Sequence, residues 1–236
     1  MSFSLKRINA IFQKDLKDLS KNMYIGSIIV LPILMAFLYS IGDGETPILL
    51  HYLVINLALS SVTAFIQCAV IAEEKEKNTL RGLMLSPASL TEILTGKSLV
   101  SLILTVVTIA LCMVITGYEP TNLPLVILAI FVASLFFLAL GTLLGLLTRS
   151  IIEASVVILP FIFLFGFGSM AKPFIEEITW LKFMEYLPNS QLEEIAYGVE
   201  VGAGFSDILE NLAIILVWVL VGVILTIFVY KKRELD

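Results

Sequence analysis

The sequence predicts an all-α membrane protein with six membrane-spanning helices. Of its 236 residues, 58% are hydrophobic and 15% are charged, whereas soluble domains carry about 25% charged residues. The charges are also unevenly placed, because six stretches of 18 to 29 residues contain no Asp, Glu, Lys or Arg. About 20 apolar residues cross a bilayer as a helix, so each stretch has the length, or nearly the length, of one span.

The elements follow from these stretches in chain order. Residues 1–21 place Leu and Ile at helical spacing with Lys and Arg on the other face. This pattern predicts an amphipathic helix lying along the membrane surface, with a helix packed on a partner protein as the alternative. The rest, 22–236, is expected to form one transmembrane domain. The expected spans are about 22–42, 46–72, 98–118, 121–148, 154–171 and 211–230.

Three spans have distinctive residues. The second span is unusually polar, and polar residues at membrane depth usually face the interior of a bundle or a subunit interface. In the fourth span, Gly141 and Gly145 form a G-x-x-x-G pair that permits close helix packing, either within the subunit or across a dimer seam. In the fifth span, Pro160, Gly166 and Gly168 predict a broken or kinked helix.

Residues 172–210, between the last two spans, predict an external helical hairpin. Apolar residues recur at helical spacing up to Pro188, which indicates a first amphipathic helix. Ser190 and Glu193 have the spacing of a capping box that opens a second short helix, which we expect to end near Gly198.

The basic residues predict the orientation. Thirteen of the fifteen Lys and Arg residues fall in the segments that lie on one side if the spans alternate, and only Lys172 and Lys182 fall on the other. Because basic residues concentrate in cytoplasmic loops, we expect both termini in the cytoplasm. The basic side comprises residues 1–21, 73–97, 149–153 and 231–236.

The segment 73–97, after the second span, is expected to form a helical elbow on that side. Its first residues, Glu73 to Lys77, are too charged for the bilayer. A short helix is expected from Thr79 to Leu85, and Pro87 ends it because proline disfavours a helical residue before it. Ser89 or Thr91 then caps the helix that enters the third span.

Several classes of protein are disfavoured by what the sequence lacks. It has no phosphate-binding loop, no G-x-G-x-x-G, one His and two Cys. No soluble stretch reaches the roughly 50 residues of an independent domain, so we expect no catalytic, cofactor or metal site and no nucleic-acid partner. Charged residues are absent from the central part of every expected span, which disfavours ion-coupled carriers and channels. A non-pumping channel or membrane scaffold remains the alternative to a transporter.

The elbow also carries a resemblance. The run E-E-K-E-K-N-T-L-R-G-L-M-L-S-P from Glu73, followed by E-I-L-T-G-K, resembles the connection after the second span in permease subunits of type 2 ABC transporters, the ABC-2 exporter family. Asn78 stands where those permeases usually have Gly. Asn is the residue next most tolerant of left-handed backbone geometry.

The resemblance implies a six-span half-transporter that pairs as a homodimer or with a similar permease. It also implies two separate ATPase subunits, which bind ATP and Mg while this chain in the bilayer has no enzymatic activity. A multi-pass location in a bacterial or archaeal inner membrane follows. The ATPase-coupling residues would be Glu73, Glu74, Lys75, Glu76, Lys77, Thr79, Leu80, Arg81, Leu83, Leu85, Ser86 and Pro87.

The cargo is expected to be an apolar or amphipathic molecule, such as a peptide, a drug or a lipid-like compound. Aromatic and polar side chains of two spans are candidates for the path, and two acidic residues of the external hairpin are candidates for its exit. The path candidates are Asn56, Ser60, Thr63, Gln67, Phe161 and Phe165, and the exit candidates are Glu193 and Glu194.

Overall fold

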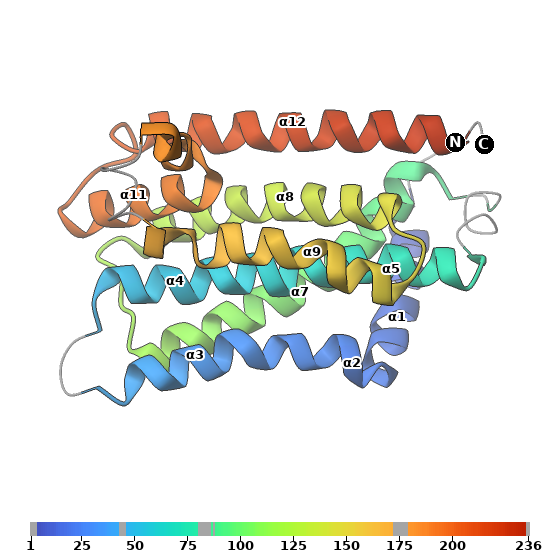
Figure 1. Ribbon diagram of the computed structural model, residues 1–236, viewed down its shortest axis with the longest axis horizontal. Coiled ribbons are helices and arrows are strands. Elements are labelled where there is room, and N and C mark those ends of the chain that lie inside the picture. The colour runs from blue at the N-terminus through green and yellow to red at the C-terminus, as the bar shows by residue number, and fades with distance from the viewer. Residues whose placement is uncertain (1–3, 43–45, 80–85, 87, 172–178, 235–236) are drawn as a thin grey trace.

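The computed structural model describes residues 4–42, 46–79, 86, 88–171 and 179–234 (Figure 1). Within these ranges every regular element is a helix, which confirms the all-α prediction. The elements are α1 (Leu5–Lys21), α2 (Met23–Gly26), η1 (Ser27–Ile29), α3 (Val30–Ser40), α4 (Ile48–Ala58), η2 (Leu59–Ala64), α5 (Phe65–Glu76), α7 (Leu90–Thr116), α8 (Leu123–Leu147), α9 (Ile151–Gly166), η3 (Gly168–Ala171), η4 (Thr179–Tyr186), α11 (Pro188–Glu200) and α12 (Leu209–Glu234).

In the described part of the chain, four helices are long and apolar enough to cross a membrane. They are Ile48–Glu76, Thr91–Thr116, Leu123–Leu147 and Leu209–Lys231, and each overlaps an expected span. The two other expected spans coincide with shorter apolar helices, Ser27–Ser40 and Ile151–Gly166. The chain therefore has the helices of a multi-pass membrane protein, and the count of six spans stays a prediction.

The helix Ile48–Glu76 is the centre of the bundle. It comprises α4, η2 and α5, and its apolar stretch is wholly buried. Helices α3, α7, α8, α9 and α11 pack around it. The middle segment η2 is a π-helix of six residues, in which Ser60 and Ser61 donate hydrogen bonds to backbone carbonyls of the preceding turn. The polar residues of this span thus lie inside one chain.

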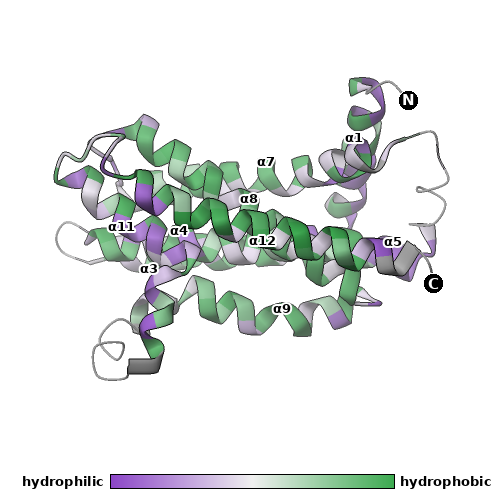
Figure 2. Cartoon of the chain, turned by 90° about the horizontal axis from the view of Figure 1, so that it is seen from above, coloured by the Kyte–Doolittle hydropathy of each residue, from purple (hydrophilic) through white to green (hydrophobic). Residues whose placement is uncertain are grey.

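The long helices of the bundle consist mostly of hydrophobic residues along their length (Figure 2), and many of these side chains are exposed. On α12, the side chains of Leu220, Ile224 and Phe228 are 61%, 63% and 66% exposed. Soluble proteins rarely expose continuous apolar surface of this extent, whereas lipid accommodates it without cost. The arrangement of exposed residues therefore agrees with the hydropathy of the helices.

The two glycines of the fourth span pack against the central helix of the same chain. A Cβ added to Gly141 would lie 2.8 Å from the Cβ of Gln67, and one added to Gly145 would lie 2.7 Å from the carbonyl oxygen of Cys68. The absence of side chains at these positions lets α8 approach η2 and α5 closely. Of the two packing alternatives, the structure shows the one within the subunit.

The hairpin after α9 differs from the prediction in one respect. Helix α11 begins at Pro188, so Ser190 lies inside its first turn and the predicted capping box is wrong. Proline is favoured at the first helical position, where its missing N–H costs nothing. Helix α11 packs against α4, α8 and α12, while residues 172–178 lie outside the described part of the chain.

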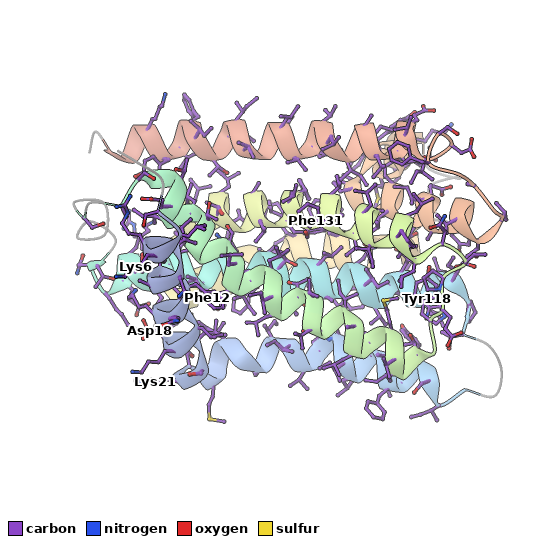
Figure 3. The ribbon with its side chains drawn as sticks, turned by 180° about the vertical axis from the view of Figure 1, so that it is seen from behind. Lys6, Phe12, Asp18, Lys21, Tyr118 and Phe131 are labelled. Atoms are coloured by element: carbon purple, nitrogen blue, oxygen red, sulfur yellow. The ribbon has the colours of Figure 1, made fainter. Side chains whose placement is uncertain are left out.

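The start of α1, the end of α5, the start of α7 and the end of α12 lie at the same end of the bundle (Figure 1). Helix α1 runs across this end instead of along the bundle, and it packs on the start of α7 (Figure 3). The elements that carry most basic residues in the sequence are therefore gathered at one end of the molecule.

Candidate functional site

The two helices that flank the elbow have well-defined ends. Helix α5 ends at Glu76, and Asn78 follows with φ of 56°, a left-handed conformation that Asn tolerates better than most residues. Helix α7 begins at Leu90, eight residues before the expected span. Of the predicted coupling residues, Leu80, Arg81, Leu83, Leu85 and Pro87 lie outside the described residues.

Ser89 is the cap of α7. Its hydroxyl accepts a hydrogen bond from the Glu92 backbone N–H at 3.3 Å, and the Glu92 carboxylate accepts one from the Ser89 backbone N–H at 2.7 Å. These reciprocal bonds form a capping box and confirm one of the two residues predicted as caps. The box sets the direction in which the chain leaves the elbow.

Arg7 attaches the start of α1 to this capping box. Its guanidinium donates two hydrogen bonds to the Glu92 carboxylate, from Nη2 at 2.7 Å and from Nε at 3.0 Å. The bond to Glu92 raises the pKa of Arg7. Bidentate pairs of this kind fix orientation as well as distance, so α1 is held in a defined position over the beginning of α7.

A second attachment between these helices is a cluster of buried charges. The Lys97 Nζ of α7 lies 3.1 Å from the Asp15 carboxylate of α1 and 3.0 Å from the Glu74 carboxylate of α5. Lys14 Nζ lies 2.8 Å from Glu74 and 3.4 Å from Asp15. We call Lys14, Asp15, Glu74 and Lys97 the ion cluster. The side chains of its last three members are at most 5% exposed.

Burial raises the pKa of Asp15, against the opposing influence of Lys97 and Lys14. Sequence reasoning did not identify Asp15 or Lys97 as site residues. A signal was present, however, because Asp15 falls on the same helical face as the buried Ile8, Ile11 and Leu19. An acid on the apolar face of a helix needs a buried partner.

The apolar face of α1 is used within the chain. Ile8, Ile11 and Leu19 are buried, and a Cβ added to Gly96 would lie 2.9 Å from the Ile11 side chain. The close approach of α1 to α7 therefore requires Gly96. This packing accounts for the amphipathic pattern of residues 5–21, and contact of α1 with the membrane surface stays a prediction.

Lys75 and Glu76 join the end of α5 to the turn between α8 and α9. Lys75 Nζ donates to the carbonyl oxygens of Leu146, at 2.7 Å, and Thr148, and the Glu76 carboxylate accepts a hydrogen bond from the Ile151 N–H at 2.9 Å. The positive group thus meets the C-terminus of α8 and the negative group meets the N-terminus of α9, as the helix dipoles favour.

The remaining described coupling residues lie nearer the surface. Lys77 and Thr79 are exposed, and Lys77 pairs with Glu73 across one turn at 2.6 Å. The hydrogen bond to Glu73 raises the pKa of Lys77. Of the described coupling residues, Glu74, Lys75 and Glu76 therefore hold neighbouring helices, whereas Lys77 and Thr79 are exposed.

Two of the predicted polar path residues, Thr63 and Gln67, bond to neighbouring helices within the chain. Thr63 Oγ1 lies 2.7 Å from Thr105 Oγ1 on α7. Gln67 donates to Thr142 on α8 at 3.0 Å and accepts from Ser101 on α7 at 3.0 Å. We call these five residues the neutral seam. All of them are buried, so they line no open path in this structure.

The two acidic residues predicted for the exit differ in their exposure. Glu193 is fully buried and accepts hydrogen bonds from Asn56, at 3.1 Å, and from Ser169, so it does not contribute to an exposed acidic surface. Glu194 is exposed. The sequence predicted an external location for Glu193, but it could not predict that α11 packs against the central helix.

The two aromatic candidates on α9 face the interior to different degrees. Phe165 is buried and makes edge contacts with Phe136 and Phe137 of α8, at centroid distances of 5.3 and 5.5 Å. Phe161 is half-buried, whereas Phe163 between them is 63% exposed. Phe161 and Phe165 therefore do not form one open aromatic wall.

An open pocket of about 550 Å³, which was not predicted, lies near the end of α3, the start of α4 and the end of α7. It is lined by His51, Tyr118, Glu119 and Glu200, among others, with the His51 ring stacked on Tyr118 at 4.7 Å. Across the described residues, no group of three or more His, Cys, Asp or Glu side chains is placed to hold a metal ion.

Comparison with known proteins identifies the family. The model of the ABC-2 family transporter proteins matches residues 13–228, which extend from α1 to α12 and include the elbow. The sequence matches no curated protein. Because the family match covers most of the chain, the chain belongs to the ABC-2 transporter family and is a membrane permease of that family, a transport subunit.

Proposed function

We propose that the chain is the permease half of an ATP-driven exporter. Two copies, or one copy and a similar permease, would form the translocation path, and two separate ATPase subunits would bind ATP and Mg. The observation that carries the proposal is the family match over residues 13–228, since permeases of this family normally pair with ATPase subunits. Export, rather than import, follows from the resemblance of the elbow.

The elbow is the proposed docking site for the ATPase. Its exposed residues include Lys77 and Thr79, and the sequence adds an apolar anchor in Leu80, Leu83 and Leu85. Apolar centres with polar rims are typical of protein interfaces. The capping box and the bonds of Lys75 and Glu76 support this proposal, because they hold both ends of the elbow in fixed positions.

The proposed orientation places both termini and the elbow in the cytoplasm. The start of α1, the end of α5, the start of α7 and the end of α12 share one end of the bundle (Figure 1), which supports a single side for all three. Thirteen of the fifteen basic residues belong to the segments assigned to that side, as expected for a cytoplasmic face. The chain would accordingly be a multi-pass protein of the cell membrane.

The proposed cargo is an apolar or amphipathic molecule. The neutral seam and Asn56 are buried within the chain, so contact of these residues with cargo would require a second conformation in which neighbouring helices separate. The exposed acids at the outer end, including Glu119, Glu194 and Glu200, would favour release of a cationic cargo.

Copurification with a candidate ABC ATPase from the same genome tests the docking site. We expect Leu83→Asp to reduce ATPase capture at least tenfold, because it places a charge in the apolar anchor. Val201→Asp is the matched control, since Val201 is 86% exposed in the turn after α11, at the other end of the bundle. Equal capture and equal ATPase stimulation by wild type and Leu83→Asp would contradict the proposal.

A further inference from the structure

We infer that Lys97 is a positioning residue that fixes α1, α5 and α7 as one unit, so that a displacement of the elbow moves both flanking helices together. The inference rests on the proposed coupling to an ATPase. It assigns a role to a residue of α7 outside the proposed docking surface. It also implies that α1 moves with the elbow when the ATPase displaces it.

The geometry places Lys97 between both ends of the elbow. Glu74 lies in the last turn of α5, where the elbow begins, and Lys97 lies two turns into α7, where the elbow ends. The Lys97 ammonium bonds to Glu74 and to Asp15 at 3.0 and 3.1 Å. One buried ammonium group therefore connects the outgoing helix, the returning helix and α1.

The chemistry of the ion cluster favours a single relative position of these helices. Its two Lys, one Asp and one Glu have formal charges that sum to zero. A shift of α1 by one turn would leave a buried charge without its partner, and such a charge is costly in a poorly hydrated site. Apolar side chains at the same positions would permit sliding, because one apolar contact replaces another at little cost.

A second attachment prevents α1 from pivoting about the ion cluster. The Arg7–Glu92 pair lies two turns of α1 away from Asp15 and joins the same two helices, α1 and α7. With two attachment points, α1 can neither rotate about Lys97 nor separate from α7 at one end. The unit continues through Lys75 and Glu76 to the turn between α8 and α9.

Removing three charges together tests the inference without leaving a buried charge unpaired. The triple variant Asp15→Asn/Glu74→Gln/Lys97→Met keeps the side-chain volumes similar, so we expect it to fold. Should it not purify, Glu74→Gln/Lys97→Met takes its place, since Asp15 then still pairs with Lys14 at 3.4 Å. Asp18→Asn is the control, because Asp18 lies one turn further along α1 with a side chain that is 38% exposed.

The measurement is the distance between spin labels at Lys17→Cys on α1 and Thr91→Cys on α7, both exposed positions. The complex with the ATPase is measured without nucleotide and trapped with ATP and vanadate. In wild type and Asp18→Asn we expect the same distance in both states. In the triple variant we expect the trapped state to broaden or shift by up to about 5 Å, one helical turn.

The outcomes separate the inference from the proposed function. If the triple variant keeps one unchanged distance in both states, the ion cluster does not couple α1 to α7 and the inference is wrong, while the proposed function stands. If the wild-type chain captures no ATPase, the proposed function and the inference are both overturned.

Discussion

The ion cluster and the neutral seam both bury polar side chains between helices, but they do so with different groups. At the elbow end, four charged residues from three helices lie within 3.4 Å of their partners. In the middle of the bundle, Thr63, Gln67 and their partners are hydroxyl and amide groups that bond at 2.7 to 3.0 Å.

Charged groups at one end and neutral groups in the middle are expected from the depth of each region in the bilayer, and they differ in how easily their bonds can be exchanged. A charge at the centre of a bilayer is costly, whereas the ion cluster borders water through Lys14, whose side chain is 47% exposed. A neutral hydrogen bond contributes about 0.5–1.5 kcal/mol, but a broken buried ion pair costs about 3–5 kcal/mol. The middle of the bundle can therefore exchange partners, while the elbow end keeps one arrangement.

The largest expected effect comes from removing Lys97 alone. Lys97→Met leaves Asp15 and Glu74 buried with only Lys14 as a shared cation, and we expect a loss of about 3–5 kcal/mol of stability. The thermal unfolding midpoint in detergent measures this. Lys17→Met is the control, because it removes the same group from the exposed face of α1. Equal unfolding midpoints for Lys97→Met and Lys17→Met would contradict the claim that the ion cluster costs more to break than the neutral seam.

A smaller effect is expected where the neutral seam depends on close packing. Gly141→Ala would place a methyl group against the Ala64 carbonyl and 2.8 Å from the Gln67 Cβ, which would push α8 away from the central helix. Overpacking of this kind costs about 1–3 kcal/mol. Gly26→Ala is the control, since nothing lies within 4 Å of its added Cβ. Equal unfolding midpoints for Gly141→Ala and Gly26→Ala would show that α8 can move away from the central helix without loss of stability.

The smallest effect concerns the exposed edge of the ion cluster. Burial lowers the pKa of Lys14, but Glu74 and Asp15 together outweigh it, so the pKa of Lys14 is raised above 10.5. A raised Lys pKa contributes stability that is complete below about pH 10.5 and is lost as the pH rises through the higher folded value.

We therefore expect the midpoint difference between wild type and Lys14→Gln to be constant at neutral pH and to shrink above about pH 10.5. For a half-exposed pair this difference is below about 1 kcal/mol. Lys17→Gln, whose side chain lies on the exposed face, supplies the baseline. A difference that grows at alkaline pH would contradict the assignment of Lys14 to the ion cluster.

Local patterns of the sequence predicted most of the helices and the ends of the elbow. Ser89 was a predicted cap because hydroxyl groups before apolar runs begin helices, and the left-handed Asn78 agrees with its place in the elbow motif. The pairing of Asp15 with Lys97 could not be read in this way, because 82 positions separate the two residues.

Tertiary packing likewise determined the contact of the G-x-x-x-G pair and the burial of Glu193, neither of which the sequence could predict. The G-x-x-x-G pair of α8 allowed either a subunit or a dimer contact, and only the position of Ala64 and Gln67 beside Gly141 resolves it. Glu193 belongs to a segment that the sequence predicted to be external, but the packing of α11 buries it beside Asn56. Hydropathy reports the depth of a segment and not the neighbours of one side chain.

The π-helical segment η2 gives the central helix an angular offset. A π turn holds an additional residue, and one residue corresponds to roughly 100° of rotation in an α-helix. Relaxation of Leu59–Ala64 to regular α-helix would therefore turn α5 about its axis relative to α4 by roughly that angle. Gln67 would then lose its bond to Thr142, and Glu74 would lose its bond to Lys97. The π-helical turn therefore sets the rotation of α5 at which the neutral seam and the ion cluster can both form.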